Sequence, residues 1–79
     1  YIQVSRDFAV FEIALPEDWI GKSIGEIDVR KKYMVNIIAV KNQDTVNVTL
    51  GPSYCFQERE SLFVIGKDKD IQKCFHILT

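Results

Sequence analysis

The spacing of hydrophobic residues along the chain predicts four strands. Residues 8–14 (FAVFEIA) combine aromatic and β-branched side chains, and Pro16 ends this strand because proline cannot donate to a sheet ladder. Residues 34–41 hold a nearly continuous apolar run and give the strongest strand signal. Apolar and polar residues alternate over 46–50, which indicates a half-exposed strand, and residues 62–65 form a last short strand that Gly66 closes. Residues 1–4 can add one more short strand.

Two helices are predicted from capping signals and apolar spacing. Residues 23–26 (SIGE) match a capping box, so a helix should begin there and run to about residue 32. Three of its side chains are spaced to share one face: Ile24, Ile27 and Lys31. A second helix should begin at Asp68 or Asp70, with apolar residues at i, i+3, i+4 and i+7: Ile71, Cys74, Phe75 and Leu78. Before the first helix, Trp19 and Ile20 are expected to anchor the chain, and Gly21 to form a turn.

This order of elements, strand–helix–strands–helix, predicts an α+β fold with helices on one face of a mixed or antiparallel sheet. Residues 1–79 contain no repeat, low-complexity tract or linker, so we expect one domain. A chain of this size buries only about 60% of the surface that it exposes when unfolded, so a partner or ligand would stabilise it. Because the chain starts at Tyr1 rather than Met, we expect it to be a fragment of a longer polypeptide.

The composition is that of an ordinary globular domain, with 47% hydrophobic and 27% charged residues. No apolar run is long enough to cross a bilayer. Cys55 and Cys74 lack the spacing of a metal knuckle, and the sequence has a single histidine, so we expect no metal site. Both cysteines are expected to be free thiols in a reducing cytoplasm.

Charge is distributed unevenly along the chain. The net charge of −1 does not favour nucleic acid as a partner. Residues 22–41 nevertheless contain five basic and two acidic residues, a local charge of +3 within a remainder of −4. A basic segment of this size suits a small anion better than a long polyanion.

Catalysis has little support in the sequence, and we expect no enzyme. Cys74 and His76 are two residues apart, so on a helix their side chains diverge and cannot act as nucleophile and base. Residues 21–25 (GKSIG) do not form a phosphate-binding glycine loop. Arg30 carries a planar fork suited to phosphate, and Asn36 can both donate to and accept from an adenine edge. Considered alone, the same residues are also consistent with a solvated helix end and an edge position in a strand.

Residues 15–39 (LPEDWIGKSIGEIDVRKKYMVNIIA) closely resemble the C-terminal ligand-binding domain, called RCK_C or TrkA-C, of Ktr and Trk potassium-uptake gating subunits. The resemblance begins at Phe8 and continues through Gly51-Pro52 and the strand over 62–66 to the last helix, so it covers nearly the whole chain. One departure is at Arg59-Glu60, where the family usually has Gly-Asp, and we expect a reshaped turn there.

The resemblance implies a cytoplasmic homodimer that binds cyclic di-AMP between its two copies and lowers potassium uptake through a membrane transporter subunit. A symmetric ligand matches a symmetric interface. Carried over onto this sequence, Arg30 would hold a phosphate and Asn36 would read an adenine edge. Apolar walls would come from Ile24, Val35, Ile37 and Pro52, and Asp28 and Lys31 would support the rim.

Two other functions remain open from the sequence. The domain could dimerise and connect gating rings without any ligand. It could also be a small-molecule sensor of the amino-acid-binding ACT type, which has a similar layout. A saturable binding curve with cyclic di-AMP would distinguish the ligand-binding hypothesis from a ligand-free dimerisation domain. A melting temperature raised by amino acids, but not by cyclic dinucleotides, would favour the ACT-type sensor.

Overall fold

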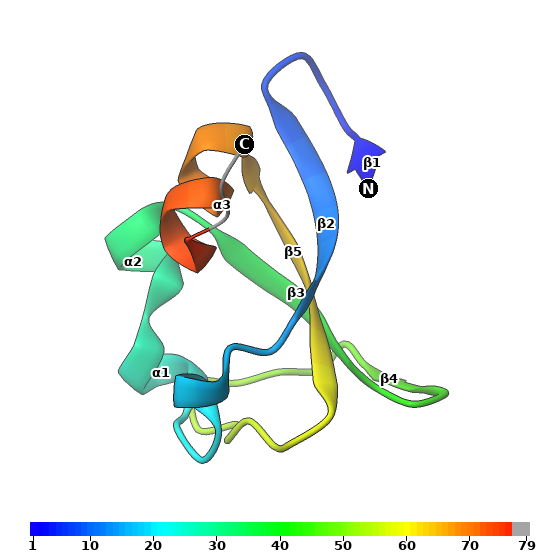
Figure 1. Ribbon diagram of the computed structural model, residues 1–79, viewed down its shortest axis with the longest axis vertical. Helices are drawn as coiled ribbons and strands as arrows, with labels where there is room; N and C mark the ends of the chain where they lie inside the picture. The colour runs from blue at the N-terminus through cyan, green and yellow to red at the C-terminus, as the bar shows by residue number, and fades with distance from the viewer. Residues whose placement is uncertain (77–79) are drawn as a thin grey trace.

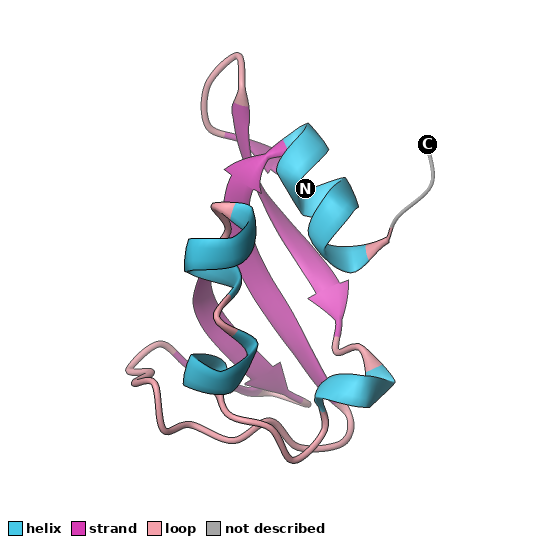
Figure 2. Ribbon diagram, turned by 90° about the vertical axis from the view of Figure 1, so that its left-hand side faces the viewer, coloured by secondary structure: helices cyan, strands magenta, loops and turns pink. Residues whose placement is uncertain are grey.

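The structure, a computed structural model that describes residues 1–76, is a five-stranded sheet with its helices on one face (Figures 1 and 2). The strands follow in sequence as β1 (Ile2–Gln3), β2 (Phe8–Ala14), β3 (Asn36–Asn42), β4 (Thr45–Asn47) and β5 (Glu60–Lys67). The helical segments are a 3₁₀ turn η1 (Glu17–Trp19) and the α-helices α1 (Ile24–Ile27), α2 (Val29–Tyr33) and α3 (Asp68–Phe75). None of the helices within residues 1–76 is long and apolar enough to cross a membrane.

The sheet has the order β1-β2-β5-β3-β4, and every pair of neighbours is antiparallel. The predicted α+β fold is therefore confirmed, but the described sheet is antiparallel rather than mixed. Strands β2 and β3 run in the same direction, yet they do not pair with each other because β5 lies between them and opposes both. The connection from β2 to β3 carries η1, α1 and α2 over one face of the sheet (Figure 1).

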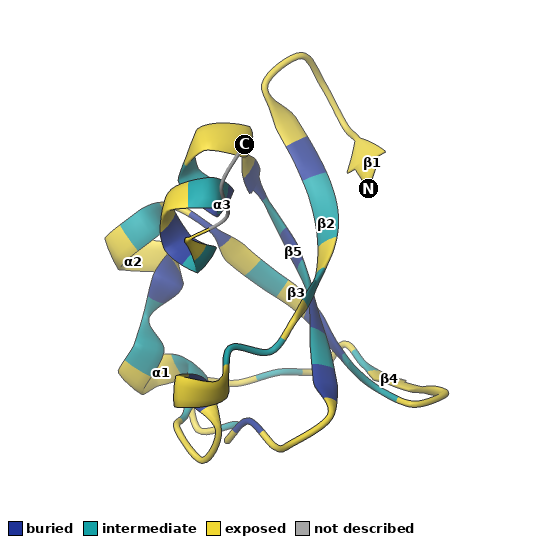
Figure 3. Cartoon of the chain, in the orientation of Figure 1, coloured by how far each residue is buried: buried dark blue, intermediate teal, exposed yellow. Residues whose placement is uncertain are grey.

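The core lies between this face and the helices (Figure 3). Alternate residues of β5 are buried, and Leu62 and Val64 are fully enclosed, as the period of two in a strand requires. The remaining buried core residues come from the helices and connections as well as from β3: Trp19, Val29, Val35, Val40, Phe56, Ile71 and Cys74. Trp19 is an anchor as predicted, packed against the Phe56 and Phe75 rings. The same expectation for Ile20 was wrong, because its side chain is 40% exposed beside the Gly21 turn.

The helix predicted over residues 23–32 is divided into α1 and α2. Its capping box is present: the Ser23 hydroxyl accepts from the Glu26 N–H at 3.1 Å, and Glu26 Oε1 accepts from the Ser23 N–H at 3.0 Å. The division occurs at Asp28, whose backbone adopts the left-handed conformation (φ 53°). This conformation ends α1 and starts α2 in a new direction, so the predicted face shared by Ile24, Ile27 and Lys31 does not exist, and Lys31 is exposed.

Three other boundaries differ from the prediction. Strand β3 begins at Asn36, because Met34 adopts a left-handed conformation that ends α2. Strand β4 ends at Asn47, so the strand expected through Leu50 is too long; residues 48–50 leave β3 and approach α1 instead. Strand β5 is longer than expected. Helix α3 begins at Asp68 and buries Ile71 and Cys74 as predicted, whereas Leu78 lies outside the described residues.

Strand β3 contains a bulge at Ile38. Asn36 and Ile37 pair with Ile65 and Val64, and Ala39 then pairs with Phe63, which leaves Ile38 without an opposite residue. Bulges often occur next to binding sites, where they redirect side chains. In this strand the bulge directly follows Ile37, which lines the pocket described next.

Candidate ligand-binding pocket

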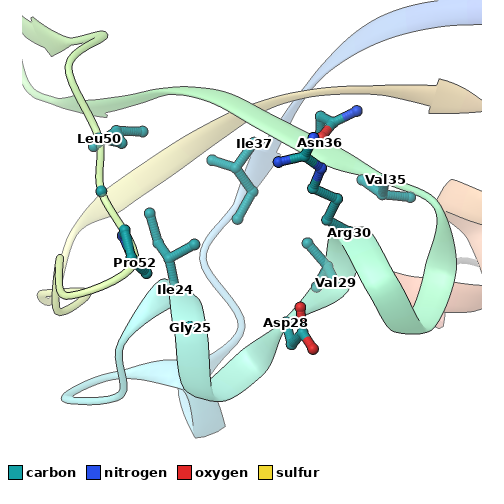
Figure 4. A pocket seen from close by; sticks show the side chains of 11 residues that line it. Ile24, Gly25, Asp28, Val29, Arg30, Val35, Asn36, Ile37, Leu50 and Pro52 are labelled. Carbon is teal, nitrogen blue, oxygen red and sulfur yellow. The ribbon is translucent and has the colours of Figure 1, made fainter.

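A pocket of about 330 Å³ lies between α1, α2, the start of β3 and the loop after β4 (Figure 4). Its lining is mainly apolar, with two charged side chains at the start of α2, Asp28 and Arg30. Ligand sites commonly combine an apolar lining with a few polar groups that orient the ligand. The pocket is therefore suited to a molecule with flat apolar parts and at least one anionic group.

Seven of the eight residues assigned to a ligand site by resemblance line this one pocket: Ile24, Asp28, Arg30, Val35, Asn36, Ile37 and Pro52. They come from two segments that are far apart in the sequence, residues 24–37 and Pro52, so the fold brings them together. Lys31 is not among the lining residues. Successive side chains on a helix point about 100° apart, and Arg30 occupies the direction toward the pocket.

Arg30 and Asn36 form the polar side of the pocket. Figure 4 shows the Arg30 side chain extending from α2 toward the part of β3 that carries Asn36. Both residues are exposed, so their polar groups are accessible to a ligand. A guanidinium that reaches an open pocket can bind a phosphate through two parallel hydrogen bonds, and the adjacent amide can both donate and accept.

The basic segment recognised in the sequence does not form one patch in the fold. Lys41 lies on the open face of the sheet, where its Nζ is 3.8 Å from Glu12 Oε2. Lys22 and Lys32 line a second cavity of about 400 Å³ beside Trp19 and Phe75. Arg30 is therefore the member of the segment that supplies positive charge to the first pocket.

Four lining residues were not predicted from the sequence: Gly25, Val29, Leu50 and Gly51. Val29 is a buried core residue as well as part of the pocket floor. Leu50 belongs to the wall opposite Arg30, which the loop after β4 provides (Figure 4). Because Leu50 alternates with polar neighbours as in a strand, no local signal marked it as a loop residue.

This loop is fastened to the start of α1 by backbone hydrogen bonds. The Gly25 N–H donates to the Pro52 carbonyl at 2.8 Å, and the Ile24 N–H donates to the Tyr54 carbonyl at 2.9 Å. A side chain on residue 25 would crowd the loop, because a Cβ there would lie 3.1 Å from the Pro52 oxygen. The absence of a side chain at Gly25 thus permits the close approach of loop and helix.

Both cysteines are free, and they differ in environment. Cys55 is exposed, whereas Cys74 lies on the buried side of α3, and burial raises the pKa of its thiol to about 11. Within residues 1–76, no group of three or more His, Cys, Asp or Glu side chains is arranged to hold a metal ion.

Comparison with known proteins shows the same fold and sequence pattern in potassium-transport proteins. The chain is 29% identical over 73 residues to the Ktr system potassium uptake protein A of Bacillus subtilis (strain 168), a match that covers 92% of this chain and 33% of that protein. It is 33% identical over 58 residues to the K(+)/H(+) antiporter subunit KhtT of the same organism, covering 72% of this chain and 35% of that protein. The chain thus spans about a third of the length of these relatives.

Among solved structures, the chain is similar to the RCK C domain of the potassium transport protein KtrA in complex with cyclic diadenosine monophosphate. The two are 27% identical, with a TM-score of 0.82, over 90% of this chain and 84% of that one. The family model of the TrkA-C domain matches residues 9–79, which is most of the chain. The chain therefore belongs to the TrkA-C domain family.

Proposed function

We propose that this chain is the regulatory domain of a potassium-transport protein and that two copies bind one molecule of cyclic di-AMP between them. Binding favours one arrangement of the two copies and lowers potassium uptake through the membrane subunit of the transporter. A ligand shifts such an equilibrium only by its difference in affinity for the two arrangements. The domain acts by binding in the cytoplasm, without catalysis.

The observation that carries this proposal is the convergence of Arg30, Asn36 and an apolar wall on one pocket in a TrkA-C fold. Arg30 is suited to a phosphate, and Asn36 to an adenine edge. Ile24, Ile37 and Pro52 offer apolar surface to the base. Support also comes from the KtrA RCK C domain, a similar structure solved with this ligand.

The pocket presents one set of these groups per chain, and cyclic di-AMP presents two identical halves. A two-fold arrangement of chains would give each half the same contacts, as expected for an isologous interface. Asp28, at the lower edge of the pocket in Figure 4, would accept a hydrogen bond from a ribose hydroxyl or the adenine amine.

The test is calorimetric titration of cyclic di-AMP into the chain and its variants. We expect Arg30→Ala and Asn36→Ala each to weaken binding at least tenfold, which corresponds to about 1.4 kcal/mol or more. Lys32→Ala is the matched control, because it removes a positive charge from the same helix at a residue outside the pocket, and it should bind like the parent.

Two outcomes would contradict the proposal in different ways. Parent-like binding by both Arg30→Ala and Asn36→Ala would show that other residues hold the ligand. Failure of the parent chain to bind cyclic di-AMP would leave a ligand-free dimerisation domain or, if amino acids raise its melting temperature, an ACT-type sensor.

A further inference from the structure

Glu60, the first residue of β5, is a carboxylate that the fold buries almost completely. Its side chain is 6% exposed, in a chain whose other buried residues are apolar or small. Both of its oxygens accept hydrogen bonds: Oε2 from the Tyr54 hydroxyl, and Oε1 from the Gln57 N–H at 2.8 Å. A buried charge is costly unless it is hydrogen-bonded, so these partners account for its presence there.

Both partners of Glu60 belong to the loop that forms one wall of the ligand pocket. Tyr54 follows Pro52 by two residues, and its own carbonyl accepts from the Ile24 N–H of α1. The Tyr54 ring also packs edge-on against buried Phe56. A continuous path therefore runs from the central strand β5, through Glu60 and Tyr54, to the wall that contains Leu50 and Pro52.

The end of the loop is also held by Phe56, which is buried in the core against Trp19 and exchanges backbone hydrogen bonds with Gly21 and Lys22. Residues 50–54, which precede it, belong to no strand or helix, and their bonds to α1 are the two backbone bonds of Ile24 and Gly25. Ordering such a loop costs conformational entropy, and a wall that is already ordered before binding improves affinity. Burial, followed by the bond to Glu60, raises the pKa of Tyr54 to about 12. The phenol is thus a reliable donor at neutral pH.

We propose that Glu60 is a positioning residue for the ligand pocket: through Tyr54 it fixes residues 50–54 of the loop, where Leu50 and Pro52 form the wall opposite Arg30. Glu60 does not line the pocket itself. The identity of the ligand rests on the proposed function above, but the ordering of the loop does not.

The first experiment needs no ligand. Amide hydrogen exchange followed by NMR is compared in the parent, Tyr54→Phe and Glu60→Gln. Loss of the Tyr54 bond should speed exchange of the Ile24 and Gly25 amides about tenfold or more, because the carbonyls that protect them belong to the freed loop. The amide of Val4, which donates to the Phe8 carbonyl in the β1–β2 turn, is the internal control: its local opening leaves the Tyr54 bond intact, so its exchange should be unchanged.

Glu60→Gln keeps one acceptor oxygen, so it can accept from only one of Tyr54 and Gln57 and turns an amide donor toward the other. Exchange at Ile24 and Gly25 should therefore rise in this variant as well. Unchanged exchange at Ile24 and Gly25 in both variants would overturn the inference. An equal increase at Val4 would also overturn it, because it would show that the effect is not specific to the loop.

The second experiment links the loop to binding by double-mutant cycles with cyclic di-AMP. Tyr54→Phe should weaken binding about fivefold although Tyr54 does not line the pocket. Its effect should largely disappear in a Pro52→Ala background, where the wall is already impaired, and persist in an Arg30→Ala background on the opposite side.

The inference would be overturned if Tyr54→Phe bound cyclic di-AMP like the parent. It would also be overturned if Tyr54→Phe weakened binding by the same factor in the Pro52→Ala and Arg30→Ala backgrounds. Both outcomes leave the proposed function intact. If the parent chain does not bind cyclic di-AMP, the proposed function fails. The exchange measurements then decide on their own whether Glu60 and Tyr54 order the loop.

Discussion

At the scale of single residues, positive φ values recur where one helix or strand ends and the next begins. Among residues 1–76, five residues other than glycine have positive φ values: Asp28, Met34, Gln43, Arg59 and His76. Each lies at the end of a helix, in the β3–β4 turn or directly before β5. For residues with a Cβ this conformation costs about 1–2 kcal/mol, so the packing of the adjoining elements must offset it.

Arg59 illustrates this cost, since its φ is 68° and the resembling family usually has glycine there. Arg59→Gly should relieve the strain, although glycine also gains freedom in the unfolded chain. We therefore expect a net increase of about 0.5–1 kcal/mol in the free energy of unfolding, measured by urea denaturation. Arg59→Ala is the control, because it removes the charged side chain but retains the Cβ. Equal stabilisation by alanine would identify the side chain, and not the backbone, as the cause.

Single residues also show how much of the candidate site could be predicted from the sequence. Arg30 and Asn36 have the chemistry to bind a phosphate and an adenine edge, but the residues alone favoured a solvated helix end and an edge position in a strand. The resemblance selected them, and the fold places both in one pocket. Glu60 was noted only as a departure from the family pattern, because no local signal marks a carboxylate that a later fold will bury.

At the scale of elements, α1 shows how a one-turn helix is held. All four of its first N–H groups have acceptors: the Tyr54 and Pro52 carbonyls for Ile24 and Gly25, and the Ser23 hydroxyl and carbonyl for the next two residues. Helices this short are not stable alone, and their first N–H groups are normally without partners. The loop and the capping box therefore make α1 possible, and α1 in turn holds the loop.

Gly25→Ala tests this mutual support. Alanine in a helix interior usually adds about 1 kcal/mol of stability relative to glycine. Here its Cβ would lie 3.1 Å from the Pro52 oxygen and 3.3 Å from the Pro52 Cβ, so the loop must move. We expect denaturation to show no gain in stability and calorimetry to show weaker cyclic di-AMP binding. If Gly25→Ala gained the full amount of about 1 kcal/mol and bound cyclic di-AMP like the parent, the loop would be able to move away from α1 without affecting stability or binding.

Most elements could be predicted from local patterns, and the misses have a common physical cause. The capping box, the strand over 8–14 and the last helix depend on nearby residues, which the sequence displays. The break at Asp28 and the early end of β4 have no comparable local signal. An aspartate in a helical pattern gives no stop signal, and Leu50 lines the pocket where a strand partner was expected.

At the scale of the whole molecule, the pocket joins two segments that are far apart in sequence. Residues 24–37 supply the floor and the polar side, and residues 50–52 supply the wall. The contribution of Val29 and Val35 to both the core and the pocket couples ligand binding to the stability of the fold. The ligand should therefore raise the melting temperature as well as bring two chains together.

Analytical ultracentrifugation and thermal denaturation test this coupling. Saturating cyclic di-AMP should produce a species with the mass of two chains and a stoichiometry of one ligand per two chains. At a free ligand concentration of about a hundred times Kd, the stabilisation should be about 2.7 kcal/mol. Arg30→Ala serves as the control and should require higher ligand concentrations for both effects. A monomeric complex with one ligand per chain would contradict the shared site.

The bulge in β3 has a consequence for how the length of this chain can vary in evolution. Losing one residue within a strand normally turns every later side chain to the opposite face. Ile38 has no partner, and the residues on either side of it, Ile37 and Ala39, pair with consecutive residues of β5. Removal of Ile38 would leave a regular ladder with each remaining side chain on its present face. This position can therefore accept the loss of a residue beside the pocket without loss of register.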